Sequence, residues 1–192
     1  MPISNFFIKR LLKAYRALNR YDEDDIDVIR YFLELYLWEI EKLIYLIVIF
    51  IALGTGLQFF VCIIAIATIR PLAGGFHAST AMRCFYWTLL GFMLAIWILP
   101  LITINSVIIV CIGVFSVVST IVAAPTRSKQ MERIANKDKD NLYRNIATFI
   151  TVIWFIILFV YQDHFLSVPL IWIIFLQNFQ LIAVWLSRKI KN

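Results

Sequence analysis

The stretch RPLAGGFHASTAMRC, residues 70–84, separates two long apolar segments of the chain. It brings two adjacent glycines, one of the two histidines and one of the three cysteines into a short polar interval. Gly74 and Gly75 permit backbone angles that other residues avoid, and Ser79 or Thr80 is a good N-cap for a new helix. The stretch therefore predicts a break between two helices.

The apolar character of the flanking segments extends through the whole chain of 192 residues. Hydrophobic residues make up 62% of it, and its mean hydropathy is +0.84, whereas soluble domains are roughly 45–50% apolar. This composition predicts an integral membrane protein. Basic residues of membrane proteins gather beside the cytoplasmic leaflet, so the formal net charge of +6 indicates topology rather than nucleic-acid binding.

Residues 1–22 predict an amphipathic helix that lies on the membrane surface. On a helical wheel, four of its five basic residues fall within about 60° of one another. These residues are Lys9, Lys13, Arg16 and Arg20. An ordinary surface helix packed on the rest of the protein would give the same wheel, so both interpretations stay open.

Six apolar segments are candidates for membrane spans, each of which needs about 20 apolar residues. They are residues 33–53, 56–72, 84–100, 104–123, 145–161 and 166–186. The break at residues 54–56 is the weakest, because residues 43–69 carry no charge and could form one kinked helix. We expect an all-α polytopic fold with about six transmembrane helices, in a single integral membrane domain over residues 1–192.

Positive charge supports the count of six. The segment 70–84 and the loop 125–144 are basic, as are both ends of the chain, whereas residues 54–56, Pro100 and residues 162–165 contain no Lys or Arg. By the positive-inside rule, both termini and both basic connections are cytoplasmic. Five spans would place the N-terminal arm and the loop 125–144 on opposite sides.

The first predicted span has a polar base that contains Glu34 and Glu41. These carboxylates share one side of a helix with Trp38 and Tyr45. Carboxylates at membrane depth are costly when they face lipid, so they should face the helix bundle or a wet cavity. If this part of the helix still lies at the water interface, the carboxylates need not face the bundle or a cavity.

His77 and Cys84 are candidates for a catalytic pair, because a cysteine nucleophile needs a base within hydrogen-bond reach. A straight helix would hold residues with this spacing about 10.5 Å apart. A loop folded back at the glycines could bring them together, in a cavity open to the cytoplasm. The spacing alone also permits a packed or palmitoylated cysteine and a hydrogen-bonded interfacial histidine.

The stretch 70–84 resembles the signature of the accessory gene regulator B (AgrB) family, integral membrane cysteine endopeptidases of Gram-positive bacterial quorum sensing. The matching residues are Arg70, Gly74, Gly75, Phe76, His77, Ala78 and Cys84. Ala124-Pro125 followed by a basic loop is also similar to the family, although the loop lacks the second proline expected there.

The resemblance implies a peptidase that removes the C-terminal tail of a precursor peptide. Cys84 would attack the scissile carbonyl, with His77 as general base and then acid. A side chain of the peptide would next displace Cys84 and give a thiolactone or a lactone. No cofactor is expected, because the sequence has no phosphate-binding loop and no convincing set of metal ligands.

Further residues are predicted to support substrate or catalysis. Arg70 would stabilise an oxyanion or a substrate carboxylate, or anchor the loop that contains Gly75 to the start of the next helix. Glu34 or Glu41 could orient His77. In the basic loop, Arg127 and Lys129 would attract an acidic tail of the peptide.

The expected partners are a precursor peptide with an amphipathic N-terminal helix and an acidic C-terminal tail, the lipid bilayer and, by resemblance, a second copy of the chain. No nucleic-acid partner is expected. The predicted location is the bacterial cell membrane, with the active site on the cytoplasmic side. The alternatives are a small membrane transporter and a non-catalytic membrane scaffold.

Overall fold

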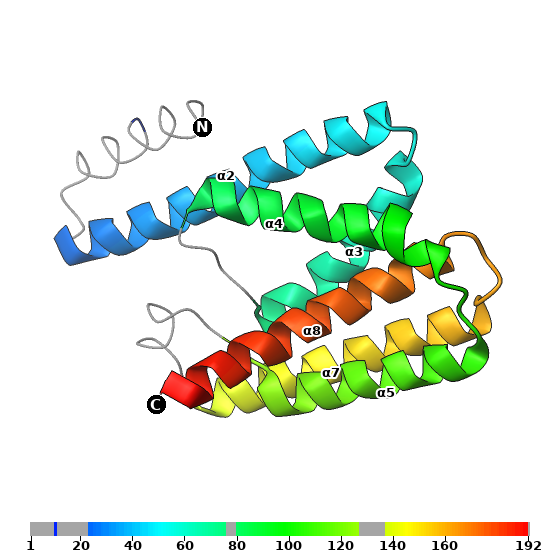
Figure 1. The fold of residues 1–192 in the computed structure, drawn as a ribbon. Coiled ribbons are helices and arrows are strands. Elements are labelled where there is room, and N and C mark those ends of the chain that lie inside the picture. The colour runs from blue at the N-terminus through cyan, green and yellow to red at the C-terminus, as the bar shows by residue number, and fades with distance from the viewer. Residues whose placement is uncertain (1–9, 11–22, 76–79, 127–136, 192) are drawn as a thin grey trace. The chain divides into compact units, whose positions relative to one another are not determined.

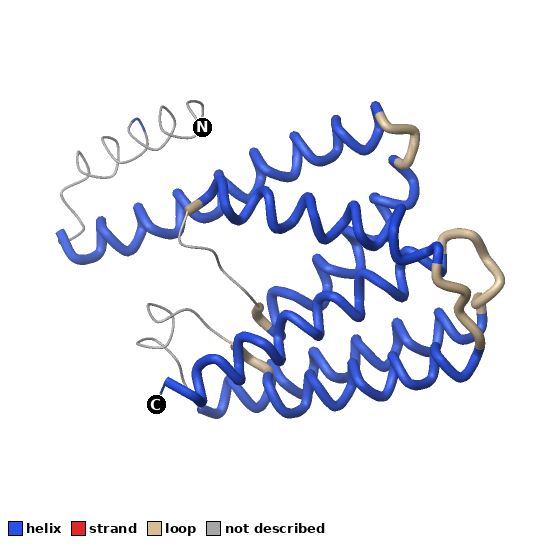
Figure 2. The backbone as a smooth tube through the Cα atoms, viewed as in Figure 1, coloured by secondary structure: helices blue, strands red, loops and turns tan. Residues whose placement is uncertain are grey.

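The computed structural model describes residues 10, 23–75, 80–126 and 137–191. The elements are α2 (Glu23–Ala52), α3 (Gly56–Ala73), α4 (Ala81–Met93), the π-helix η1 (Leu94–Ile98), the 3₁₀-helix η2 (Leu99–Leu101), α5 (Ser106–Ala123), α7 (Lys137–Val160) and α8 (Ser167–Lys191) (Figure 1). No strand occurs among the described residues apart from one isolated bridge, and helices make up nearly all of the backbone trace (Figure 2). The all-α prediction is confirmed.

Among the described residues, five segments are long and apolar enough to cross a membrane, so the chain is a polytopic membrane protein. These segments are Gly56–Ala73, Met82–Leu101, Ser106–Ala123, Lys139–Val160 and Ser167–Ile190. α2 covers the first predicted span, 33–53, as one continuous helix, but it is not among the five. Glu39, Glu41 and Lys42 directly precede the apolar half of α2, so these charges interrupt the apolar run that a span needs. The sixth span therefore stays a prediction.

The chain forms two compact units, Met1–Leu53 and Gly54–Asn192. The first contains α2 and the second contains all later helices. The single domain predicted for residues 1–192 stays a prediction. The N-terminal amphipathic helix predicted over residues 1–22 lies outside the described residues, apart from Arg10.

The predicted helix breaks agree with the structure. α2 ends at Ala52 and α3 begins at Gly56, with Gly54 between them at φ +73°, so one long helix over residues 43–69 is excluded. The span at 84–100 ends in the turn that contains Pro100, which has no backbone N–H to continue a helix.

One boundary differs from the prediction. α7 begins at Lys137, inside the basic loop predicted over residues 125–144. Its first turns, KDKDNLYR, carry no apolar pattern that marks a span, but water can solvate a charged helix that extends beyond the hydrocarbon layer. Hydropathy therefore locates the membrane segment and misses the start of the helix.

Within the second unit, α5 packs mainly against α7 and α8, and α3 packs against the same two helices (Figures 1 and 2). Thr120 Oγ1 of α5 donates to Asn178 Oδ1 of α8 at 3.0 Å, and Trp154 Nε1 of α7 donates to Thr68 Oγ1 of α3 at 2.9 Å. Hydrogen bonds between helices and small residues that permit close approach hold helices together in a membrane, where burial of apolar surface gives little driving force.

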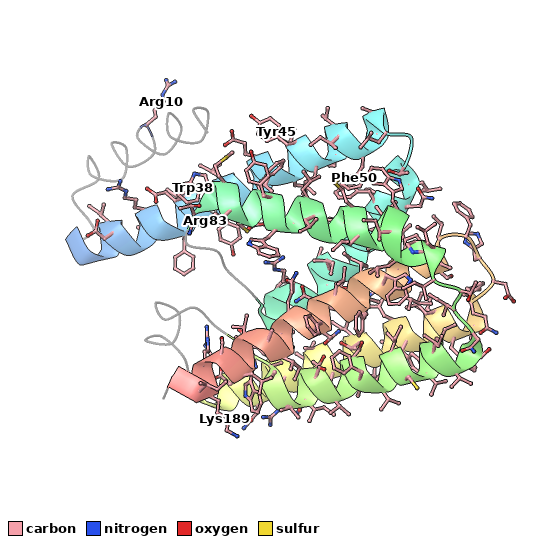
Figure 3. All side chains as sticks on the ribbon, viewed as in Figure 1. Arg10, Trp38, Tyr45, Phe50, Arg83 and Lys189 are labelled. Carbon is pink, nitrogen blue, oxygen red and sulfur yellow. The ribbon has the colours of Figure 1, made fainter. Side chains whose placement is uncertain are left out.

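Basic residues gather at one end of this unit. The C-terminal ends of α3, α5 and α8 and the N-terminal ends of α4 and α7 lie at that end (Figure 1). Figure 3 places Arg83 and Lys189 there. Residues 84–126 and 145–187 contain no Lys or Arg. At the opposite end, Ser106 Oγ donates to Gln162 Oε1 at 3.0 Å.

The contact between α5 and α7 can be tested at Gly113. A Cβ added there would lie 2.1 Å from Cε2 of Phe155, whereas one added at Gly91 of α4 would meet nothing within 4 Å. Both Gly→Ala changes gain about 1 kcal/mol of helix propensity. We therefore expect Gly113→Ala to be less stable than Gly91→Ala by about 1–3 kcal/mol in thermal unfolding of the purified protein in detergent micelles. Equal stability of the two variants would contradict this packing.

Candidate active site

The helix that carries Cys84 begins where the sequence predicts. Thr80 is the N-cap of α4, and its Oγ1 accepts a hydrogen bond from the backbone N–H of Arg83 at 3.3 Å. The N–H of Cys84 donates to the carbonyl of Thr80 at 3.0 Å, and the carbonyl of Cys84 accepts from Thr88 Oγ1 at 2.8 Å. Cys84 therefore lies at the end of the first turn, on a backbone that the cap fixes.

α3 ends in a glycine bend at the other side of the break. Gly74 has φ +79°, and its N–H donates to the carbonyl of Arg70 at 2.8 Å. This left-handed conformation is easy only for glycine. The predicted unusual backbone is thus confirmed, and Arg70 lies in the last turn of α3.

The glycine bend pairs with the segment that follows α5. The N–H of Thr126 donates to the carbonyl of Ala73 at 2.9 Å, and Gly74 and Thr126 form a parallel bridge. A Cβ at Gly74 would lie 2.1 Å from the backbone oxygen of Thr126. Glycine is therefore required here for space as well as for conformation. The pair Ala124-Pro125, which the sequence singles out separately, directly precedes this contact.

α8 supplies a second link to the bend. Nε2 of Gln177, a buried residue, donates to the carbonyl of Gly74 at 3.0 Å. A Cβ at Gly75 would lie 3.2 Å from the same nitrogen. Gln177 is not among the site residues predicted from the sequence. A signal existed, because Gln177, Asn178 and Gln180 interrupt an apolar segment, and polar residues in a membrane helix usually face the protein interior.

A cavity opens between α3, α4 and α8. Its polar lining residues are Arg70, Cys84, Thr88, Gln177 and Gln180. Its apolar lining residues include Ile66, Trp87, Phe92 and Ile173. Cys84, half-buried, and Arg70 thus share one cavity.

The helix directions give this cavity a polarity. Cys84 precedes Phe92 on α4, which starts at the basic end of the unit. Ile173 precedes Gln177 and Gln180 on α8, which ends at the basic end. Arg70, Cys84, Gln177 and Gln180 therefore lie toward the basic end, and Ile66, Phe92 and Ile173 lie deeper in the helix bundle.

Several predicted site residues cannot be placed in this cavity. His77, Arg127 and Lys129 lie outside the described residues, so the approach of His77 to Cys84 stays a prediction. Gly75 is described, and it is buried next to Gln177.

Glu34 and Glu41 both lie on α2, in the first unit, and each has a partner on that helix. Arg30 Nε donates to Glu34 Oε1 at 2.9 Å, and this hydrogen bond raises the pKa of the Arg30 guanidinium. Tyr45 Oη donates to Glu41 Oε1 at 3.4 Å. A role for either carboxylate in orienting His77 stays a prediction.

The other two cysteines lie in different environments. Cys62 is fully buried in α3. Cys111 is exposed on α5. Its position within an apolar run does not specify which face of the helix it occupies.

The cavity combines groups that suit acyl transfer. A thiolate is a nucleophile, a guanidinium binds carboxylates and oxyanions, and amide side chains pair with peptide groups. Cys84, Arg70 and Gln177 supply these three groups in one lining. Covalent catalysis would proceed through a thioester on Cys84 once a base accepts its proton.

The family model described as Accessory gene regulator B matches residues 3–182, a range that contains the whole cavity and the Gly74–Thr126 bridge. No curated protein and no solved structure matches the chain.

The bridge at Gly74 can be tested with a matched glycine. Gly54 and Gly74 have similar positive φ angles, +73° and +79°, so alanine is strained by about 1–2 kcal/mol at both. Only at Gly74 does the added Cβ also meet the backbone of Thr126. We expect Gly74→Ala to lower the midpoint of thermal unfolding more than Gly54→Ala does. Similar losses in the two variants would show that the contact with Thr126 contributes little.

Proposed function

Because the chain belongs to the accessory gene regulator B family, we propose that it is a membrane-embedded cysteine endopeptidase that removes the C-terminal tail of a quorum-sensing precursor peptide. The family supports a role in quorum-sensing peptide processing. The peptidase assignment depends on one observation, the position of Cys84 in the cavity with Arg70 and Gln177. Cys62 lies buried in α3, and Cys111 lies on an exposed face of α5.

In the proposed reaction, the sulfur of Cys84 attacks the scissile carbonyl carbon. His77 accepts the thiol proton and then donates it to the departing amine as the C–N bond breaks. The C-terminal tail leaves, and the N-terminal part of the peptide stays on Cys84 as a thioester. Arg70, in the same cavity, is suited to stabilise the carbonyl oxygen as it becomes negative, or to bind a carboxylate of the substrate.

The thioester is then resolved within the peptide. A cysteine thiol or a serine hydroxyl of the bound fragment attacks the thioester carbonyl, the bond to Cys84 breaks, and a cyclic thiolactone or lactone is released. The sulfur of Cys84 recovers the proton that the attacking group loses. The product is thus a cyclic peptide, and the enzyme returns to its starting state.

The orientation in the membrane follows from charge. The basic end of the second unit would face the cytoplasm by the positive-inside rule, and the polar part of the cavity lies toward that end. A precursor with an amphipathic helix would lie on the same leaflet. Its acidic tail would be attracted by the basic loop that includes Arg127 and Lys129, and by Arg188 and Lys189 at the end of α8.

The nucleophile is tested by Cys84→Ala. The substrate for this test is a short peptide with an amphipathic start, an internal cysteine or serine and an acidic tail, to be sought in a reading frame beside the gene and co-expressed with the protein. We expect loss of cleavage by at least about 10³-fold, because no other group replaces a covalent nucleophile. The measurement is mass spectrometry of the peptide and of the acyl adduct on Cys84.

Cys111→Ala is the matched control, because it removes a thiol outside the cavity, and it should retain cleavage. Cleavage that persists in Cys84→Ala would exclude the peptidase mechanism and leave the transporter and the scaffold as the functions to examine.

The orientation is tested by cysteine labelling of intact cells, in a chain that lacks Cys84 and Cys111. Asp163 and Lys189 are both exposed, at opposite ends of the second unit. We expect a membrane-impermeant maleimide to label Asp163→Cys in intact cells, and Lys189→Cys only after the membrane is permeabilised. The reverse pattern would place the polar part of the cavity outside the cell.

A further inference from the structure

Gln177 is buried at a cost that needs a structural or functional explanation. Gln177 is 4% exposed and lies on α8, a helix that is otherwise mostly apolar. An amide removed from water without a hydrogen bond is destabilising by roughly 2–7 kcal/mol. The bond that it makes, to the carbonyl of Gly74, is therefore the natural place to look for its role.

The Gly74 carbonyl belongs to the bend between the two halves of the proposed site. Arg70 lies in the last turn before the bend, and Gly75 follows Gly74 directly. The carbonyls at a helix C-terminus have no partners within the helix and must find them elsewhere. Here the carbonyl of Ala73 accepts from Thr126, and that of Gly74 accepts from Gln177. Two segments distant in sequence thus hold the bend.

Gln177 also lines the cavity that contains Cys84. Its carboxamide has two N–H donors and one acceptor oxygen, and the bond to Gly74 uses one donor. The same side chain therefore contacts the bend and borders the space that a substrate would occupy. A buried residue with a purely packing role needs neither contact.

We propose that Gln177 is a positioning residue of the peptidase, which holds the Gly74 carbonyl and thereby sets the orientation of the Arg70–Gly75 bend relative to Cys84. This inference rests on the proposed function. The motif at residues 70–84 lies entirely on α3, α4 and the segment between them. Through the Gln177 side chain, α8 also contributes to the site.

The test compares Gln177→Met, which keeps the size and removes the donor, with Asn178→Leu on the next residue of α8. Asn178 is also fully buried and accepts a hydrogen bond from Thr120, but it does not line the cavity. Thr120 keeps the carbonyl of Ser116 as an acceptor when Asn178 is replaced. The two variants thus share the loss of a buried amide and differ in contact with the site.

We expect Gln177→Met to slow acylation of Cys84 by the co-expressed precursor by about fivefold or more, the size of one net hydrogen bond, with KM changed less than twofold. Asn178→Leu should keep the acylation rate within twofold of the unsubstituted protein. Unchanged acylation in Gln177→Met, or an equal loss in both variants, would overturn the inference.

Gln177→Glu supplies a pH readout that packing alone would not give. An ionised carboxylate only accepts hydrogen bonds, so it cannot donate to the Gly74 carbonyl, whereas the protonated acid can. We expect the ratio of the Gln177→Glu rate to the unsubstituted rate to rise as the pH falls, and the corresponding ratio for Gln177→Met to stay flat. A Gln177→Glu ratio that does not rise with falling pH would argue against the hydrogen bond.

A reaction that needs no peptidase activity separates the two proposals. The rate at which N-ethylmaleimide alkylates Cys84, followed by mass spectrometry in the Cys111→Ala protein, should change at least threefold in Gln177→Met and stay within twofold in Asn178→Leu. If the protein does not cleave the precursor but this difference is found, the proposed function fails and the positioning role holds. If the protein cleaves and neither rate responds to Gln177→Met, the positioning role alone fails.

Discussion

The backbone contact between Gly74 and Thr126 is the constraint on which the site depends. A chain that leaves a helix near the membrane must find partners for its carbonyl groups, because lipid supplies none. The carbonyl of Ala73 finds the N–H of Thr126, at a separation so close that the residue at Gly74 has no room for a side chain. The ends of α3 and α5 are therefore locked together at the level of the backbone.

This contact also explains how two distant segments serve one site. The segment after α5 leads directly into the basic loop, and the bend after α3 leads directly into the residues before α4. Because the two segments pair, the basic loop starts next to the bend that precedes Cys84. In the proposed reaction, an acidic tail attracted by the loop would already be near Cys84, which would favour attack through proximity rather than through tight binding of the whole peptide.

The sequence predicts the helices well and the tertiary contacts poorly. Thr80 is recognisable as an N-cap, and Gly74 as a helix stop, because capping depends on neighbouring residues. The start of α7 at Lys137 is missed, because hydropathy indicates which residues prefer lipid and does not indicate where a helix forms in water. Gln177 is missed because its partner lies far away in the chain, and no local pattern identifies the carbonyl that a buried amide will bind.

The division of the cavity into a polar end and an apolar end affects whether the proposed thioester would be hydrolysed or cyclised. Water and an internal thiol compete for the same carbonyl, and water has the advantage of concentration at an open site. Ile66, Phe92 and Ile173 form apolar surface in the deeper part of the cavity, while Cys84 lies toward the polar end. A peptide side chain that fills the apolar part excludes water from it and holds the fragment close to the thioester. In the proposed reaction, an attacking group on the same fragment would act at a high effective concentration. Cyclisation would then be faster than hydrolysis even if no protein group activated the attacking thiol in preference to water.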